Sequence, residues 1–158
     1  MKVRPICASD NKPLSQVLRT VLLEMGVPKI GTAYADPELD KLFETYQNEN
    51  MHYYVLEHKQ KLLGGAGIAP LPAAHKFICE LQKMYFLPEA RGKGWGTEMM
   101  NVCLQFAKSR QFKQCYIETM PNMKEAQALY QRFGFEYLEA PLGNTGHFSC
   151  SVWMLKQL

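Results

Sequence analysis

The chain has 158 residues, of which 47% are hydrophobic and 21% carry a charge. These values are typical of a globular protein and exclude an intrinsically disordered chain, so we expect residues 1–158 to form a single domain. The formal net charge of +3 is small, and no run of basic residues concentrates it. The sequence therefore gives no reason to expect a nucleic-acid-binding protein.

The sequence carries no recognisable membrane or secretion signal. Its apolar stretches are shorter than the ~20 residues that a membrane helix needs, and Met1–Asp10 lacks the apolar segment of a secretion signal. The five cysteines are widely spaced and never form a CxxC pair, a pattern that predicts neither a metal site nor a disulfide framework. We expect reduced thiols in a cytoplasmic protein without a membrane partner.

The first third of the chain predicts one strand followed by two helices. Val3–Cys7 has the pattern of a short strand. Pro13 suits the first position of a helix, apolar residues then recur at helical spacing, and Gly26 is a typical helix end. A second helix is predicted from Asp36 and Pro37. Its apolar stripe consists of Leu39, Leu42, Phe43 and Tyr46.

The remainder predicts a β-rich middle followed by strand–helix units. The polar residues 58–61 separate two extended segments, which is the pattern of a hairpin. We expect strands at His52–Glu57, Leu62–Pro70, Lys76–Leu87, Gln114–Thr119, Phe135–Leu138 and Cys150–Lys156, with helices at about 96–110 and 123–133. Asn122 and Glu125 have the spacing of a capping box at the start of the last helix. This order predicts a mixed α/β (α+β) fold with a parallel strand pair within one central sheet and helices on both faces.

The strongest local signal is the segment Arg91-Gly92-Lys93-Gly94-Trp95-Gly96, which leads from a strand into a helix. Its three alternate glycines let the backbone approach a ligand closely. The helix that follows offers unpaired N–H groups and the positive end of its dipole. Together these features predict a pyrophosphate site, with Arg91 and Lys93 adding positive charge at its edge.

Three other interpretations of this segment differ in how well the residues fit them. The glycines could serve only a tight strand-to-helix turn, and the segment alone leaves that open. A P-loop does not fit, because no Lys-Ser or Lys-Thr follows the glycines. A dinucleotide-binding fingerprint does not fit either, because the spacing is GxGxG and the segment lies in mid-chain.

Together with a second motif at Ala126–Phe135, this segment makes the chain resemble the GNAT superfamily of N-acetyltransferases. Arg91–Gly96 matches the family motif Gln/Arg-x-x-Gly-x-Gly/Ala, Glu80–Pro88 resembles the fourth strand, and Ala126–Phe135 resembles the element AxxLYxxxGF. The order of elements agrees along essentially the whole chain. The resemblance implies the GNAT fold, with a single mixed sheet of about six to seven strands whose fourth and fifth strands splay into a wedge.

The resemblance also implies acetyl-CoA as the acyl donor. The pantetheine arm would lie in the wedge against the backbone of Met84, Tyr85 and Phe86. The pyrophosphate would bind the N–H groups of Arg91, Gly92, Lys93, Gly94, Trp95 and Gly96. Asn122 resembles an asparagine that family members place beside the pantetheine. It stands four residues before Ala126, where the common pattern has three, so a cofactor role and a capping role both stay open.

The activity implied is acetyl transfer to a primary amine of a small molecule or peptide, by direct attack in a ternary complex. A lysine-like amine has a pKa of about 10.4, so a base must help to remove its proton. Glu80, eleven residues before Arg91, resembles the glutamate base of some members, acting directly or through water, although it could be an ion-paired strand residue. Tyr130 would protonate the coenzyme A sulfur, unless it is a packing tyrosine. A backbone N–H near Tyr85 would hold the oxyanion.

Three further residues are candidates for the acceptor pocket: Tyr34, His147 and Cys150. His147 precedes the last strand, where this fold shapes its acceptor pocket, and could be an alternative base or a structural histidine. Cys150 could line the same pocket, support a ping-pong mechanism, or be a plain reduced strand cysteine.

Two other functions stay open on the sequence. One is a catalytically silent coenzyme A-binding module used in regulation. The other is an unrelated α/β domain whose glycine turn is structural. Dimers are common in the family, which leaves a homodimer open, and the sequence does not identify the amine acceptor.

Overall fold

The computed structural model describes residues 1–158 and contains one seven-stranded sheet in the order β1-β2-β3-β4-β5-β7-β6. The strands are β1 (Lys2–Pro5), β2 (His52–His58), β3 (Lys61–Pro70), β4 (Ile78–Phe86), β5 (Gln114–Thr119), β6 (Glu136–Leu138) and β7 (Val152–Gln157). The helices are α1 (Asn11–Glu24), α2 (Leu42–Thr45), α3 (Trp95–Ser109) and α4 (Lys124–Arg132). The predicted single mixed sheet is confirmed.

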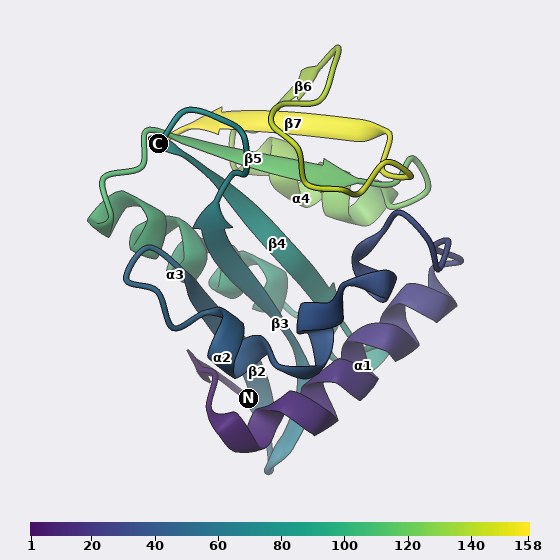
Figure 1. Cartoon of the computed structure of the whole chain (residues 1–158). Coiled ribbons are helices and arrows are strands. Elements are labelled where there is room, and N and C mark those ends of the chain that lie inside the picture. Colours follow the sequence, from purple (N-terminus) through teal and green to yellow (C-terminus); the bar gives the residue numbers. More distant parts are fainter.

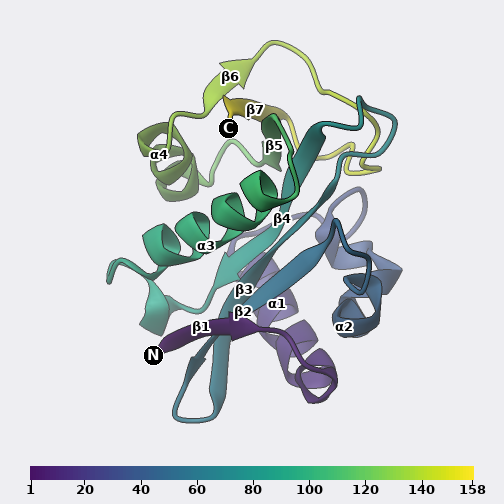
Figure 2. The same ribbon diagram turned by 90° about the vertical axis from the view of Figure 1, so that its left-hand side faces the viewer.

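The helices form two layers, one on each face of the sheet. Figure 2 shows α1 and α2 on one side of the strands and α3 and α4 on the other. One core cluster includes Met99 and Cys103 of α3, and a second includes Leu14 and Leu18 of α1. No helix of the chain combines the length and the apolar character that crossing a membrane requires.

Helix α1 forms where the apolar spacing predicts it. Leu14, Leu18 and Leu22 recur every four residues and are fully buried against the sheet. Gly26 follows the helix with φ +65°, and the N–H of Val27 donates to the carbonyl of Leu22 at 3.0 Å. This left-handed glycine closes the helix as expected.

The second predicted helix is wrong as a continuous element. The structure has short 3-10 turns at Ala33–Ala35 and Pro37–Asp40, and then the single helical turn α2. Lys41 interrupts the segment with φ −141° and ψ 42°. The helix restarts there because the side chain of Asn11, which lies in α1, accepts the N–H of Phe43 at 2.8 Å.

Several strand ends also differ from the prediction. The first strand is Lys2–Pro5 and the last is Val152–Gln157, so Cys150 lies in the loop before the last strand. Strand ends are set by where ladder hydrogen bonds stop, which the local pattern does not fix.

Strands β4 and β5 form the parallel pair and then separate. Their paired residues are Ile78 with Gln114, Cys79 with Cys115 and Glu80 with Tyr116, and no pairing follows. Figure 1 shows the two strands starting side by side and diverging toward their arrowheads. The predicted wedge is therefore present, and Glu80 lies at its apex.

Candidate active site

The glycine segment forms a turn at the entrance to α3. Gly92 and Gly94 have φ +68° and +84°, and Gly94 is the residue that precedes the helix. A Cβ atom on either residue would meet nothing within 4 Å. Both glycines are therefore required by backbone conformation rather than by lack of space.

This turn presents a row of unpaired backbone donors. Glu98 is the first residue to donate into α3, to the carbonyl of Gly94 at 3.1 Å. The N–H groups from Gly92 to Thr97, six consecutive residues, make no hydrogen bond within the chain. Consecutive free N–H groups at a helix N-terminus are an anion site, so the geometry fits a diphosphate.

The charged side chains of the turn make hydrogen bonds and ion pairs within the protein rather than pointing into the anion site. The guanidinium of Arg91 pairs with Glu24 at the end of α1 at 2.8 and 2.9 Å, and its Nε donates to the carbonyl of Phe86. Lys93 donates to the carbonyl of Glu89 at 2.8 Å. The backbone therefore supplies most of the anion site, and Glu24 offsets the charge of Arg91.

Gly96 brings α4 close to this turn. A Cβ atom on Gly96 would lie 3.1 Å from Cδ2 of Leu129, so a larger residue would push that side chain away. Leu129 precedes Tyr130 on the same helix. The third glycine of the motif therefore positions the second family element against the first.

Tyr130 is buried but its hydroxyl is available. The side chain is 6% exposed and its ring centroid lies 6.0 Å from that of Phe135. The hydroxyl has no partner within the chain, and the structure contains no sealed, unpaired side-chain oxygen, so this hydroxyl is not fully closed off from the surface. Burial raises the pKa of Tyr130 well above its usual value, which keeps the phenol protonated as a donor.

Strand β4 carries a bulge within the wedge. The β3–β4 register shifts between Gly65 and Gly67, and Lys83 has φ +51°. The hydroxyl of the buried Tyr53 donates to the carbonyl of Lys83 at 2.8 Å. The bulge redirects the backbone just before Met84, Tyr85 and Phe86, the segment predicted to meet the pantetheine.

Glu80 is almost completely buried at the apex of the wedge. It is 3% exposed, and its Oε2 accepts a hydrogen bond from Nε2 of Gln82 at 2.6 Å. The pKa of Glu80 is raised to about 7: burial is the largest cause and the charge of Glu118 adds to it, while the hydrogen bond from Gln82 acts in the opposite direction. A carboxyl that titrates near neutral pH suits a general base.

Two further groups converge on Glu80. These groups are Glu118 and His147, and one polar atom of each lies within 4.8 Å of one carboxylate oxygen of Glu80 and of the other. Three such atoms could together hold a metal ion or an ammonium group. Glu118, from β5, accepts the hydroxyls of Tyr116 at 2.8 Å and Thr145 at 2.6 Å. Sequence reasoning missed Glu118, since nothing along the chain marks which acidic strand residue faces the wedge.

His147 is held by an ion-pair network rather than lying on the surface. Its Nε2 is 3.0 Å from Asp36, which also pairs with Lys83 at 2.7 Å. Burial is the largest single cause and lowers the pKa of His147, but the hydrogen bond and charge of Asp36, together with the charge of Glu80, raise the pKa overall. A histidine tied to a carboxylate in this way holds the loop before β7 against the segment before α2.

Cys150 does not have the character of a nucleophile. It is half-buried, and burial together with the charges of Glu118 and Glu80 raises its pKa to about 12. The thiol is therefore protonated at neutral pH, which opposes the ping-pong alternative.

The remaining predicted residues have mixed outcomes. Asn122 does not cap α4, because the residue at the N-cap position is Met123 and no side chain caps the helix. The side-chain amide of Asn122 donates instead to the carbonyl of Met25 at 2.9 Å. The capping-box prediction is therefore wrong. Tyr34 packs on the same small apolar cluster as Tyr85, formed by Leu22, Val27 and Ala33.

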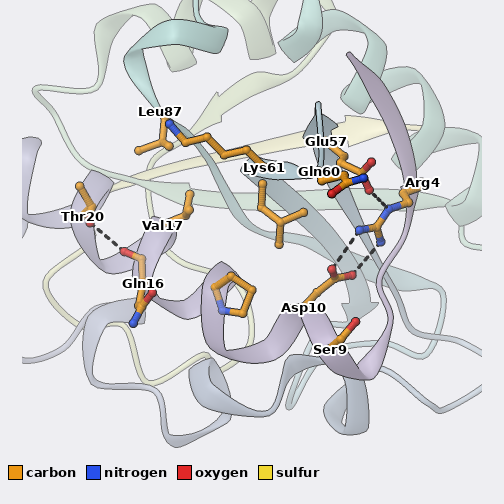
Figure 3. A pocket seen from close by; sticks show the side chains of 12 residues that line it. Arg4, Ser9, Asp10, Gln16, Val17, Thr20, Glu57, Gln60, Lys61 and Leu87 are labelled. Carbon is orange, nitrogen blue, oxygen red and sulfur yellow. Dashed lines mark hydrogen bonds and ion pairs between the residues drawn. The ribbon is translucent and has the colours of Figure 1, made fainter.

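A polar cavity of about 760 Å³ lies away from these residues, between α1, β1 and the β2–β3 hairpin. Figure 3 shows Arg4 at its wall, hydrogen-bonded to Asp10 and Glu57. Lys61, on the opposite wall, pairs with Glu89. It contains none of the predicted site residues, and its charged groups are already paired.

Comparisons with known proteins agree with this geometry. Residues 21–135 match the family model described as Acetyltransferase (GNAT) family. An uncharacterized N-acetyltransferase of Escherichia coli (strain K12), YjgM, is 43% identical over 157 residues, which cover 99% of this chain and 94% of that protein. N-acetyltransferase 8 of Homo sapiens is 25% identical over 129 residues, 77% of this chain and 54% of that protein.

Solved structures of low sequence identity share the fold. A GNAT-family acetyltransferase from Staphylococcus aureus Mu50 has a TM-score of 0.86 at 17% identity, over 99% of this chain and 98% of that one. A phosphinothricin acetyltransferase from Sinorhizobium meliloti, in complex with AcCoA, has a TM-score of 0.77 at 20% identity, over 99% and 88% of the two chains. With the family match and the 43% identical relative, these findings establish that the chain belongs to the GNAT family of acetyltransferases and is an acyltransferase.

Proposed function

We propose that the protein transfers an acetyl group from acetyl-CoA to a primary amine of a small molecule or peptide, by direct attack in a ternary complex. The observation that carries this proposal is the row of six unpaired N–H groups from Gly92 to Thr97 beside the open edge of β4. It supports binding of the diphosphate of acetyl-CoA, with the pantetheine along Met84, Tyr85 and Phe86.

The binding residues divide into backbone and side-chain contributions. Backbone N–H groups of the segment Arg91–Gly96 take the diphosphate, although the N–H of Arg91 itself donates to Pro88 at 3.1 Å. Asn122 stays a candidate for contact with the pantetheine, and this is supported by its Oδ1, which accepts no hydrogen bond while its Nδ2 donates to the carbonyl of Met25. Tyr34, His147 and Cys150 remain the residues predicted for the acceptor side.

The residues supply acid, base and oxyanion stabilisation. The acceptor attacks the thioester carbonyl as the neutral amine, and Glu80 takes one proton from its nitrogen, directly or through water, as the carbon–nitrogen bond forms. An N–H of β4 near Tyr85 hydrogen-bonds the oxyanion. The carbon–sulfur bond then breaks, and Tyr130 donates a proton to the departing thiolate. Each of the two proton transfers is the kind of step that a positioned side chain accelerates by about 10²–10⁴-fold.

The test is thiol release from acetyl-CoA with a panel of primary amines. We expect Tyr130→Phe to lower kcat by about 10²-fold or more, while the rise in Tm caused by coenzyme A is retained. Tyr137→Phe is the matched control, since the hydroxyl of this half-exposed tyrosine is already engaged, donating to Gln127 of α4 at 2.9 Å. The control should keep the wild-type rate.

Other outcomes would select the alternatives. Stabilisation by coenzyme A without turnover of any amine would indicate a catalytically silent module. No change in Tm at millimolar coenzyme A would contradict the anion site, because a ligand specific for the folded state must stabilise it.

A further inference from the structure

A buried hydrogen-bond chain connects Glu80 to the opposite helix layer. The hydroxyl of Tyr46, just after α2, donates to Oε1 of Gln82 at 2.5 Å, and Nε2 of Gln82 donates to Oε2 of Glu80 at 2.6 Å. We propose that Tyr46 and Gln82 are positioning residues, which fix Glu80 by one oxygen and leave the other free to face the acceptor. This inference rests on the proposed function, in which Glu80 is the base.

The direction of the chain follows from the chemistry of its groups. An ionised carboxylate can only accept hydrogen bonds, so the amide of Gln82 must present its NH₂ group to Glu80. The carbonyl of the same amide then faces Tyr46, whose hydroxyl donates to it. Tyr46 thereby fixes which way the amide points, and a reversed amide would place two acceptors against each other.

The strand geometry places Gln82 where this contact is possible. Residues two apart on a strand point to the same face, so Glu80 and Gln82 lie side by side on β4. The Oε1 atom of Glu80 accepts no hydrogen bond, and the structure has no sealed, unpaired side-chain oxygen. One oxygen is thus held while the other is open.

Packing holds Tyr46 in place. Its side chain is 3% exposed, and its ring meets that of Tyr53 edge-on, with centroids 5.2 Å apart. A Cβ atom on Gly67 of β3 would lie 2.6 Å from the Tyr53 ring and 2.7 Å from the Tyr46 ring. The absence of a side chain at Gly67 therefore lets both rings press against the sheet, so Tyr46 cannot easily leave Gln82.

The charges around Glu80 come from several elements. Glu118 faces it from β5 and raises its pKa, whereas His147 from the loop before β7 and Lys83 from β4 lower it. Burial is the largest cause and raises it. Among these, Gln82 is the neutral group that contacts Glu80 directly and stabilises the ionised form.

The test is the pH dependence of kcat/KM. Gln82→Met keeps the side-chain length but loses the donor that stabilises ionised Glu80, so the pKa of Glu80 should rise. The acidic limb of the profile, where kcat/KM falls as Glu80 is protonated, should then move to higher pH by about one unit or more, as expected for a hydrogen bond to a charged group. The rate on the high-pH plateau should change much less. Tyr46→Phe should move the limb in the same direction by less, and it provides a second variant if Gln82→Met does not fold.

A matched control separates this effect from general destabilisation. Gln127 is also buried and also accepts a tyrosine hydroxyl, that of Tyr137, but it donates to the carbonyl of Met120 rather than to a carboxylate. Gln127→Met should lower Tm and leave the acidic limb in place. The rise in Tm caused by coenzyme A confirms that each variant is folded.

The outcomes distinguish this inference from the proposed function. If Glu80→Gln retains the wild-type rate and the acidic limb, the base assignment itself is wrong. If Glu80→Gln loses activity but Gln82→Met and Tyr46→Phe lower Tm without moving the limb, then the chain is only structural and this inference is overturned.

Discussion

The burial of Glu80 has a consequence for stability that needs no substrate. Its pKa is about 7 in the folded chain against 4.5 for a free side chain, mainly because burial penalises the charged form. At a pH between 4.5 and about 7, Glu80 is therefore mostly ionised in the unfolded chain but mostly protonated in the folded chain. The folded state therefore loses stability as the pH rises from about 4.5 to 7. Below and above this range, the contribution of Glu80 to the free energy of unfolding does not change with pH.

The magnitude follows from this difference in pKa. At about 1.4 kcal/mol per pH unit, the gap between 4.5 and about 7 is worth about 3 kcal/mol. A neutral side chain at this position has no such penalty, and the amide in Glu80→Gln can still accept from Gln82. We expect the variant to gain about 3 kcal/mol of unfolding free energy over the wild type between pH 4 and pH 8.

Urea unfolding of both proteins at a series of pH values measures this difference. Groups that titrate alike in the two proteins cancel, which isolates Glu80. Glu57→Gln is the control, because Arg4 lowers the pKa of Glu57, so that its pH dependence lies below about pH 4.5 and its difference from wild type should stay flat from pH 5 to pH 8. A difference between Glu80→Gln and wild type that stays flat from pH 4 to pH 8 would refute the raised pKa of Glu80.

Three other changes test separate parts of the structure. Gly94→Ala should cost roughly 1–3 kcal/mol, because φ is +84° there, and should weaken coenzyme A binding in a thermal-shift titration. Gly67→Ala should cost about 1–3 kcal/mol by urea unfolding, because its Cβ would meet two buried tyrosine rings at 2.6 and 2.7 Å. Asp36→Asn should lower the pKa of His147, because the hydrogen bond that raises it loses its charge, as an NMR titration of the imidazole would show.

Features that depend on neighbouring residues were predicted well. The turn at Gly92 and Gly94 follows from their position before a helix, and its free N–H groups follow from the helix start itself. Helix α1 and the β2–β3 hairpin likewise follow from apolar spacing and turn residues. In these cases the nearest residues along the chain impose the conformation.

Features that depend on distant partners were not predicted. The helix expected from Asp36 breaks at Lys41, where a side chain 32 residues away in sequence, that of Asn11, caps its second part. The capping box, one of two roles that the sequence allows for Asn122, does not form, because its amide donates to the carbonyl of Met25, 97 residues away. Short-range patterns carry no information about such partners, and tertiary contacts override the local preference.

The sequence by itself determined the family, the order of strands and helices, and the turn whose free backbone N–H groups can bind an anion. Each of these follows from patterns within short stretches of consecutive residues. Only the tertiary structure decided that Glu80 stands at the apex of the wedge beside Glu118, and that Gln82 and Tyr46 hold it. The physical reason is that ionisation and hydrogen bonding depend on burial and on distances in space. Both are set by the packing of segments that the sequence keeps far apart.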